Sequence, residues 1–299
     1  MTATPGRVWH SGAKVNLFLR VLGRRADGFH DIESVFHPIG LADRMTFCPG
    51  RGFSLTVSVV SPGAPGPPSD ETNLVTRAAR ALAELAGVEP AATVELAKAI
   101  PTGAGLGGGS SNAAAALLGL RELWGLSVGD DDLAVLGARL GSDVPFFLYG
   151  RSALVAGRGE TVTPLPAPTA LWFVLGISRV PLAVADVYRA WDRSGTTHAE
   201  ETVAVASGLA AGDPEALART VHNDLEEPAF GLRPELRAQK EALLGAGALA
   251  AIMSGSGAAL CGLARDRTHA EEIARRVAGS FDRVEVVGSR SPAVQAAGS

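Results

Sequence analysis

The chain has 299 residues, 46% of them hydrophobic, and a formal net charge of -4 with an isoelectric point of about 5.9. This length allows about two domains with large buried cores. The weakly acidic balance gives no reason to expect nucleic acid or an anionic membrane surface as a partner. Cys48 and Cys261 have neither metal-ligand spacing nor a disulfide framework, which favours a reducing cytoplasm.

The first half of the chain is expected to alternate strands and helices. Alternating apolar residues and β-rich composition predict strands over 8–21, 44–48, 53–60 and 93–98. Apolar periodicity and helix-start signals predict helices over 73–86, 113–123 and 131–140. Ser110, Ser111 and Asn112 offer N-caps for the second of these helices. The Pro/Gly-rich stretch 61–69 is typical of a surface connection.

The second half shows the same alternation after a proline-rich segment, 161–169, which puts the expected domain boundary at about residue 165. Expected strands are 171–177, 248–253, 258–263 and 283–287, and expected helices are 213–222, 235–244 and 268–278. Residues after Ser289 are expected to fray. The uncharged stretch 243–264 is long enough to span a bilayer, but its internal Ser-Gly-Ser-Gly favours a strand, a loop and a strand.

A glycine loop, residues 101–111, follows the strand expected at 93–98 and contains five glycines within seven residues. Glycine permits positive φ angles, so the loop amides can converge on an anion, and the helix that follows presents its positive end there. No lysine follows the glycines, so the loop is not a Walker A motif. The spacing Gly103-x-Gly105-x-x-Gly108 matches a dinucleotide fingerprint, although its surroundings do not resemble a tight Rossmann turn. The loop predicts a phosphate site, with a dinucleotide site or an ordinary glycine-rich turn as alternatives.

Lysine is rare in this chain. Of 27 basic residues, only Lys14, Lys98 and Lys240 are lysine, and the others are arginine. In a chain that otherwise uses arginine, a lysine is more often needed for a chemical role, because its ammonium is compact and its pKa can be shifted by the surroundings. Mutational bias is the alternative explanation. Asn16 lies two residues after Lys14 and would face the same side of the expected strand.

The chain resembles the GHMP kinase superfamily in three motifs that occur in order. These are Ala13-Lys14-Val15-Asn16-Leu17-Phe18-Leu19 with Arg25-Ala26-Asp27-Gly28-Phe29-His30, the glycine loop with its Ser-Ser-Asn-Ala-Ala ending, and Ser254-Gly255-Ser256-Gly257-Ala258. The first two together are similar to the member of the superfamily that acts on a cytidyl-diphosphate alcohol. The resemblance extends from about residue 13 to about residue 263.

The resemblance implies an α+β fold with an N-terminal ATP-binding domain, 1–165, like the second domain of ribosomal protein S5. It implies a C-terminal GHMP kinase domain, 166–299, with an α/β-plait, and an active site in the cleft between the two. The implied reaction is ATP-dependent phosphorylation of the 2-hydroxyl of a methylerythritol moiety, giving the 2-phosphate and ADP. ATP carries Mg²⁺, for which Ser110 or Ser111 are candidate ligands, and no acidic residue can be assigned to the metal.

The resemblance also implies roles for individual residues. Asp143 corresponds to the catalytic base and Lys14 to the cation beside it. The implied substrate-binding residues are Asn16, Phe29, His30, Tyr188, Gly255 and Ser256, although the family more often has tyrosine at position 29. The implied nucleotide-binding residues are Lys98, Pro101, Thr102, Gly103, Ala104, Gly105, Leu106, Gly107, Gly108, Gly109, Ser110 and Ser111.

Plainer interpretations stand beside these roles. Asp143 could cap the turn before Pro145, Lys14 could be a strand-end surface lysine, and Tyr188 could be a helix-face aromatic. For the whole chain, the alternatives are a GHMP kinase acting on homoserine, mevalonate or a sugar, an NAD(P)-dependent oxidoreductase, and a non-catalytic nucleotide sensor. The remaining histidines lack metal spacing and are expected to be structural or exposed: His10, His37, His198, His222 and His269.

Overall fold

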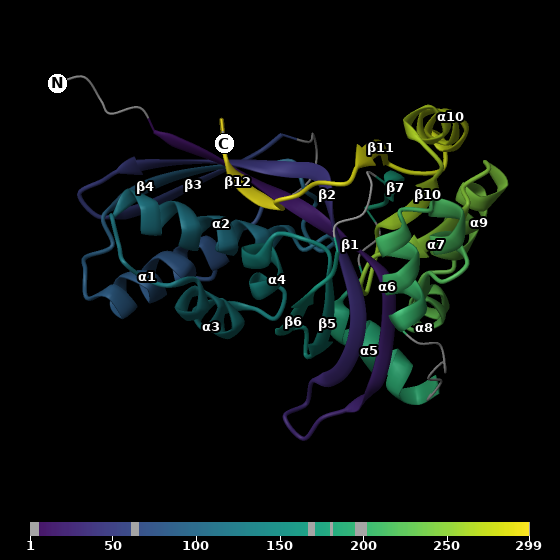
Figure 1. Cartoon of the computed structure of the whole chain (residues 1–299), viewed down its shortest axis with the longest axis horizontal. Helices are drawn as coiled ribbons and strands as arrows, with labels where there is room; N and C mark the ends of the chain where they lie inside the picture. The colour runs from purple at the N-terminus through teal and green to yellow at the C-terminus, as the bar shows by residue number, and fades with distance from the viewer. Residues whose placement is uncertain (1–5, 61–65, 167–170, 180–181, 195–201, 299) are drawn as a thin grey trace.

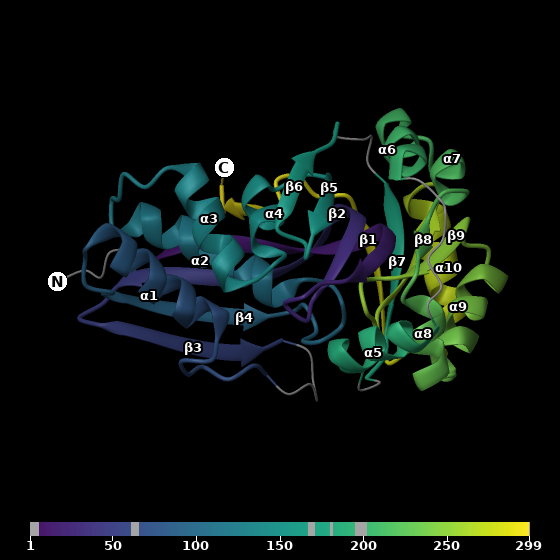
Figure 2. The ribbon, with the colours of Figure 1, turned by 90° about the horizontal axis from the view of Figure 1, so that it is seen from below.

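The structure is a computed structural model that describes residues 6–60, 66–166, 171–179, 182–194 and 202–298. The expected connection at 61–69 and the expected boundary segment at 161–169 lie partly outside these residues, and His198 lies wholly outside them. Two sheets with helices packed on them form the described part of the chain (Figures 1 and 2). The α+β class expected from the sequence is therefore confirmed.

The first sheet has eight strands: β1 (Arg7–Arg24), β2 (His30–Pro49), β3 (Phe53–Val59), β4 (Ala92–Lys98), β5 (Ala153–Gly157), β6 (Thr161–Pro164), β8 (His222–Asn223) and β12 (Val294–Ala296). Its main path runs β12-β1-β2-β4-β3, while β5 pairs with β2 and β8 pairs with β1. The helices that follow the early strands lie together on one face of this sheet (Figures 1 and 2). They are α1 (Leu74–Ala86), α2 (Gly108–Leu123), α3 (Asp130–Leu140) and α4 (Val144–Tyr149).

The second sheet has four antiparallel strands in the order β11-β7-β10-β9. These strands are β7 (Trp172–Ile177), β9 (Ala250–Met253), β10 (Leu260–Ala264) and β11 (Arg283–Gly288). The later helices surround it (Figure 1). They are α5 (Val184–Ser194), α6 (Thr202–Ala211), α7 (Pro214–Ala218), α8 (Glu226–Leu232), α9 (Glu235–Gly245) and α10 (Arg267–Val277).

The long β1–β2 hairpin joins the two sheets into one body. It runs from the first sheet down between the two halves (Figure 1). Its middle is buried on both faces, because residues 11–19 of β1 are all buried. Leu17 and Ile39 of the hairpin share a core cluster with Phe173 of the second sheet. A polar side chain in the middle of β1 is therefore forced to lie at the junction of the two halves.

Several predicted elements differ from the structure. The strand expected at 44–48 is only the end of β2, whose earlier part was hidden by polar residues and by Pro38 and Gly40. The helix expected at 113 begins at Gly108, with Gly107 at its N-cap in a left-handed conformation, so Ser110, Ser111 and Asn112 lie inside the helix and do not cap it. A Cβ on Gly108 would lie 2.8 Å from Ile100 Cγ2, so the first residue of this helix has no room for a side chain.

Predicted elements beyond residue 200 also differ from the structure. The described residues after Ser289, 290–298, are not a frayed tail, since Val294–Ala296 pairs antiparallel with β1. The helix expected over 213–222 ends at Ala218, because His222 and Asn223 pair with β1 instead. The sequence pattern missed α5, α6, α8, β5 and β6. The stretch 243–264 forms the end of α9, then β9 and β10, and no helix among the described residues has the length and apolarity to cross a membrane.

His37 is a buried polar residue on β2 that ties distant segments together. Its Nδ1 lies 2.9 Å from the Ser152 hydroxyl, and its Nε2 lies 2.8 Å from the Ser289 hydroxyl. Burial lowers the pKa of His37 to about 3. The imidazole is therefore neutral in the folded protein, with one ring nitrogen donating and the other accepting.

This burial predicts a pH dependence of stability. The unfolded chain takes up a proton at an ordinary histidine pKa of about 6.5, whereas the folded chain does so only near the lowered pKa of His37, about 3. The contribution of His37 to stability is thus complete above the unfolded value and is lost as the pH falls toward the folded value. From about pH 7 to about pH 5, it should lower the free energy of unfolding by about 2 kcal/mol. Urea denaturation of the wild type and His37→Gln at both pH values tests this, and equal pH slopes would contradict it.

Candidate active site

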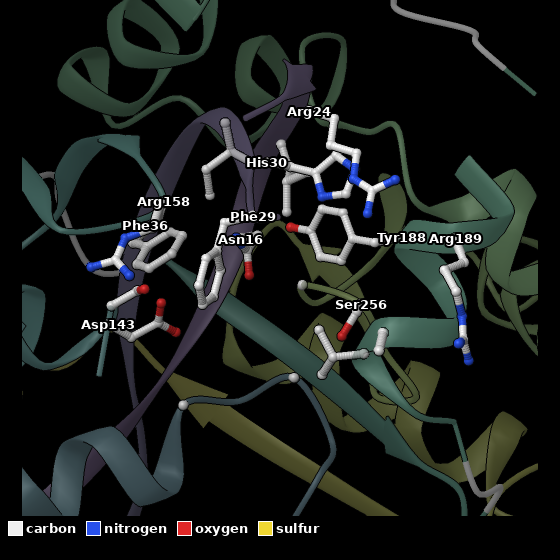
Figure 3. A pocket seen from close by; sticks show the side chains of 18 of the residues that line it. Asn16, Arg24, Phe29, His30, Phe36, Asp143, Arg158, Tyr188, Arg189 and Ser256 are labelled. Atoms are coloured by element: carbon white, nitrogen blue, oxygen red, sulfur yellow. The ribbon is translucent and has the colours of Figure 1, made fainter. Parts of the chain in front are cut away.

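One pocket of about 640 Å³ lies between the β1–β2 hairpin, the glycine loop and α5 (Figure 3). Its walls come from segments far apart in the sequence. They include two glycines of the loop, Gly105 and Gly107. They also include every catalytic and substrate residue expected from the sequence: Lys14, Asn16, Phe29, His30, Asp143, Tyr188, Gly255 and Ser256.

Lys14 places a desolvated cation in the wall of this pocket. Its side chain is 3% exposed, and its Nζ lies 3.7 Å from Asp143 Oδ2. Nζ also lies 4.3 Å from the centroid of the Phe36 ring. Burial lowers the pKa of Lys14 below the ordinary lysine value, and the neighbouring Asp143 carboxylate opposes part of that shift. Lys14 is therefore not the strand-end surface lysine considered above.

Asn16 is oriented by bonds on both sides of its amide. Its Oδ1 accepts a hydrogen bond of 2.6 Å from Lys14 Nζ, and its Nδ2 donates one of 2.9 Å to Ser34 Oγ. Ser34 in turn donates to the carbonyl of Phe18. The expectation that Lys14 and Asn16 face the same side of the strand is confirmed, and β2 holds both in place.

Asp143 directs its carboxylate toward the pocket. It occupies the N-cap position of α4, yet its side chain makes no capping hydrogen bond. Gly159, at a φ of 122°, lies close by, and a Cβ there would be 3.3 Å from Asp143 Oδ1. The capping role considered as an alternative is absent, so the carboxylate is available for chemistry with a ligand.

The glycine loop takes the conformation that its composition predicts. Gly103, Gly105 and Gly107 have φ values of 73°, 76° and 71°. A Cβ on Gly105 would lie 1.9 Å from the Ser254 carbonyl oxygen, and one on Gly107 would lie 2.7 Å from the Phe147 ring. The approach of the Ser254 backbone at Gly105 and of the Phe147 ring at Gly107 requires glycine at both positions.

The N-terminus of α2 offers a place for an anion directly after this loop. The first amides of a helix have no helical partner, and in this 16-residue helix no N-cap side chain accepts from them. Such amides, with the positive end of the helix dipole, favour phosphate. The loop backbone and the helix end together offer donors for an anionic group such as a phosphate.

Lys98 lies beneath the loop and does not line the pocket. It is 4% exposed, donates to the Asp43 carboxylate, and donates a second bond of 3.0 Å to Asn112 Oδ1. Asp43 Oδ1 accepts from the amides of Ala99 and Ile100 at 2.7 and 2.8 Å. This buried network supports the start of the loop, and a direct contact between Lys98 and nucleotide stays a prediction.

The candidate metal ligands differ in access. Ser111 is fully buried, and its hydroxyl has no hydrogen-bond partner. Ser110 is partly exposed, and its Oγ would lie 3.7 Å from a Cβ on Gly141, beside the turn that carries Asp143. Across the described residues, no group of three or more His, Cys, Asp or Glu could hold a metal. Ser110 is the better placed of the two hydroxyls for an ion carried by phosphates.

The opposite end of the pocket is aromatic and basic. The Phe29 side chain is 52% exposed, and the Arg158 guanidinium lies 4.9 Å from its ring centroid (Figure 3). The His30 ring stacks on Tyr188 at 4.7 Å. Burial, with a smaller effect from Asp143, raises the pKa of Tyr188, so its hydroxyl stays protonated.

Sequence reasoning missed several residues of this pocket. They are Arg24, Arg158, Arg189 and Asp192. Arginine is the default basic residue of this chain, so nothing in the local pattern separates these arginines from surface charges. The i, i+4 spacing of Tyr188 and Asp192 was the one available signal, and it required the helix α5 to be recognised first.

Comparisons with known proteins agree with this geometry. The family described as GHMP kinases N terminal domain matches residues 73–151, and the family described as GHMP kinases C terminal matches residues 205–283. A relative from Symbiobacterium thermophilum, named 4-diphosphocytidyl-2-C-methyl-D-erythritol kinase, is 42% identical over 89% of this chain and 93% of its own length. A relative of the same name from a Nocardioides species is 43% identical over 90% of this chain and 92% of its own.

Solved structures give the same result. A crystal structure of 4-(cytidine 5'-diphospho)-2C-methyl-D-erythritol kinase aligns with a TM-score of 0.80 at 36% identity, covering 94% of this chain and 98% of the other. Homoserine kinase from Cytophaga hutchinsonii aligns with a TM-score of 0.75 at 21% identity, covering 99% and 98%. At that identity the second likeness shows the fold alone.

The glycine loop supplies a matched pair of substitutions. Alanine at Gly103 meets no atom within 4 Å, so it should cost only the strain of a left-handed residue, about 1–2 kcal/mol. Alanine at Gly105 has the same strain and also meets the Ser254 carbonyl. We expect Gly105→Ala to lose much more thermal stability and ATP affinity than Gly103→Ala. Thermal unfolding and nucleotide titration measure this, and similar losses in both would show that the close approach is unimportant.

Proposed function

The chain belongs to the GHMP kinase family, and we propose that it phosphorylates the 2-hydroxyl of 4-diphosphocytidyl-2-C-methyl-D-erythritol with ATP. It is an ATP-dependent small-molecule kinase, and the proposed products are the 2-phosphate and ADP. The observation that supports this most is the Lys14–Asp143 pair at 3.7 Å in a pocket that also contains the glycine loop, Phe29 and His30. A reaction of this kind belongs to the methylerythritol phosphate route to isoprenoid precursors, and a cytoplasmic location is expected for it.

Asp143 and Lys14 would handle the proton and the charge of the attacking hydroxyl. Asp143 is the carboxylate whose oxygens are free of capping bonds, so it can accept the hydroxyl proton as the oxygen attacks the γ-phosphorus. Lys14 then faces the alkoxide character that develops on that oxygen, from a site with little water to screen it. Asn16 holds the ammonium in place through its bond of 2.6 Å.

The nucleotide would bind with its phosphates at the glycine loop and the first turn of α2. The amides at the start of α2 can donate to phosphate oxygens, and the glycines let the backbone approach them. Magnesium carried by ATP would neutralise charge on the phosphates, and the partly exposed Ser110 hydroxyl would be the candidate ligand from this chain. Lys98 would also hold the start of the loop from below, and its direct contact with ATP stays a prediction.

The substrate base would bind at the aromatic end of the pocket. Phe29 presents an exposed ring face for stacking, and His30 and Tyr188 lie close to it (Figure 3). Phenylalanine at position 29 keeps the stacking surface of the tyrosine common in the family and lacks its hydroxyl. Homoserine and mevalonate have no base, so they would leave this end of the pocket unused.

A coupled ADP-release assay tests the proposal. The cytidyl alcohol should be turned over efficiently, and homoserine, mevalonate and sugars should not. Lack of turnover with the cytidyl alcohol, together with turnover of one of the others, would replace the proposed substrate while keeping the kinase family. The comparisons do not favour a dinucleotide-dependent oxidoreductase or a non-catalytic sensor.

Removal of the proposed base should slow the chemical step. Asp143→Asn keeps the side-chain shape but cannot take the proton, so kcat should fall by roughly 10²–10⁴-fold while ATP affinity changes little. Asp130→Asn is the matched control, since Asp130 is 88% exposed and pairs with Arg121 away from the pocket. Steady-state kinetics and nucleotide titration are the measurements. A normal kcat in Asp143→Asn would refute the role of the carboxylate.

The lowered pKa of Lys14 predicts the alkaline limit of activity. The reaction needs the charged ammonium, which is present below the folded-state pKa and lost above it, so kcat should decline at a pH below the ordinary lysine value of about 10.4. Lys14→Arg keeps its charge throughout this range. We expect it to be slower at neutral pH but to lack the decline. If kcat declines at the same alkaline pH in both proteins, the decline is caused by an ionisable group other than Lys14.

A further inference from the structure

The base-binding end of the pocket contains a histidine–aspartate pair, His30 with Asp192, that the catalytic chemistry does not use. We propose that Asp192 is a positioning residue that holds the proton of His30 on Nε2, so that His30 Nδ1 accepts a hydrogen bond and selects a base with an exocyclic amino group. The selection of a base rests on the proposed function. The protonation state of His30 does not, and it can be measured without substrate.

The contact between the two side chains is direct and sheltered. His30 Nε2 lies 2.7 Å from Asp192 Oδ1, although 162 residues separate them in the sequence. The His30 side chain is 8% exposed. A carboxylate can only accept, so Nε2 must carry the hydrogen of this bond. The bond joins the β1–β2 hairpin to α5, and therefore depends on the packing of the two halves.

The α5 helix holds the imidazole by three residues on one face. Tyr188 stacks on the ring at 4.7 Å with an interplanar angle of 27°, and Trp191 meets it edge-on at 5.7 Å. Asp192 completes the set at positions i, i+3 and i+4. With two rings limiting its tilt and one bond limiting its rotation, His30 has a defined orientation in the pocket.

The second oxygen of Asp192 faces a cation. Arg24 Nη1 lies 3.9 Å from Asp192 Oδ2, and both residues line the pocket. The carboxylate thus has a positive partner on one side and the imidazole N–H on the other. Asp192 therefore lies between the guanidinium and the imidazole, and its contact with Nε2 fixes the side of the ring that carries the donated hydrogen.

The consequence is that Nδ1 of His30 acts as a hydrogen-bond acceptor. In a neutral imidazole with its hydrogen on Nε2, Nδ1 has only a lone pair. No protein group in the described part of the chain is hydrogen-bonded to that atom, so it is left for a ligand. The amino group of cytosine can donate to it. Uracil presents a carbonyl oxygen at the same ring position, and two acceptors facing one another leave both unpaired.

The size of this discrimination follows from the cost of one mismatched buried hydrogen bond. Such a mismatch weakens binding by roughly 5- to 150-fold. A doubly protonated His30 would reverse the preference, because Nδ1–H would then donate to the uracil carbonyl. The two states of His30 therefore predict opposite base preferences.

The first test reads the ring nitrogens of His30 by ¹⁵N NMR of the full chain without ligands. The spectrum is followed to a pH at which the His30 signals no longer move, and His30→Gln assigns them. We expect Nε2 to carry the proton and Nδ1 to be unprotonated. Asp192→Ala should give mixed tautomers, and Asp192→Glu, which keeps the carboxylate, should restore the wild-type pattern.

The same spectrum contains an internal control. His222 Nε2 lies 2.8 Å from Asp224 Oδ1, which is a matched pair outside the pocket. Its signals should be identical in the wild type and in all Asp192 variants. A proton on His30 Nδ1 in the wild type, or a His30 pattern unchanged in Asp192→Ala, would overturn the assignment.

The second test compares cytidyl- and uridyl-diphosphate methylerythritol as substrates. The wild type should prefer the cytidyl compound. Asp192→Ala should raise its KM by about 10-fold with little change in kcat, and should reduce the cytidyl-to-uridyl ratio of kcat/KM by roughly 5- to 150-fold. Asp192→Glu should recover most of the ratio, and Asp130→Asn should not change it.

The outcomes separate the inference from the proposed function. An unchanged ratio in Asp192→Ala would overturn base selection by this pair. If the wild type turns over neither compound, the proposed substrate is wrong and base selection by the pair is wrong with it. In that case the NMR result still decides whether Asp192 sets the state of His30.

Discussion

The ammonium of Lys14 lies in the middle of a strand that is buried on both faces, and much of the pocket is arranged around this charge. Removing an ammonium from water is costly unless other groups replace its hydration. Here Asn16, the face of Phe36 and the Asp143 carboxylate do so, from β1, β2 and the N-cap of α4. Because these elements belong to one folded body, the charge is stabilised only when the pocket is assembled.

A second buried lysine shows what the same physics does without a pocket. Lys98 is as buried as Lys14, but Asp43 and Asn112 complete its hydrogen bonds within the protein. Asp43 also accepts two backbone amides just before the glycine loop. One lysine thus faces a space that a ligand can fill, and the other stabilises the backbone that forms the edge of that space. The difference lies in the partners and not in the burial.

Local patterns in the sequence predicted much of the first half of the site and little of the second. The glycine loop, the shared side of Lys14 and Asn16, and the exposed Phe29 follow from spacing, composition and family motifs within short windows. His30 also follows from the family motif, but Asp192 and its contact with His30 do not, since the two residues meet only through the packing of α5 on the hairpin. The start of α2 was placed too late because glycine ordinarily disfavours helix, whereas here the helix begins at Gly108, where the neighbouring Ile100 leaves no room for a side chain. The polar residues of β2 hid most of a 20-residue strand for a related reason, since its neighbours on both sides supply the burial.

The last strand, β12, is a partner of the first strand, β1, although the two are translated at opposite ends of synthesis. It pairs with β1, so the first residues of the sheet find one of their neighbours only when residues 294–296 have been made. The short strand β8 adds a second late partner at Phe18 and Leu19. A nascent chain whose first half has emerged from the ribosome still has an unpaired β1 edge, and such an edge is prone to pairing with other chains. The N-terminal half therefore completes its sheet last, although it is translated first.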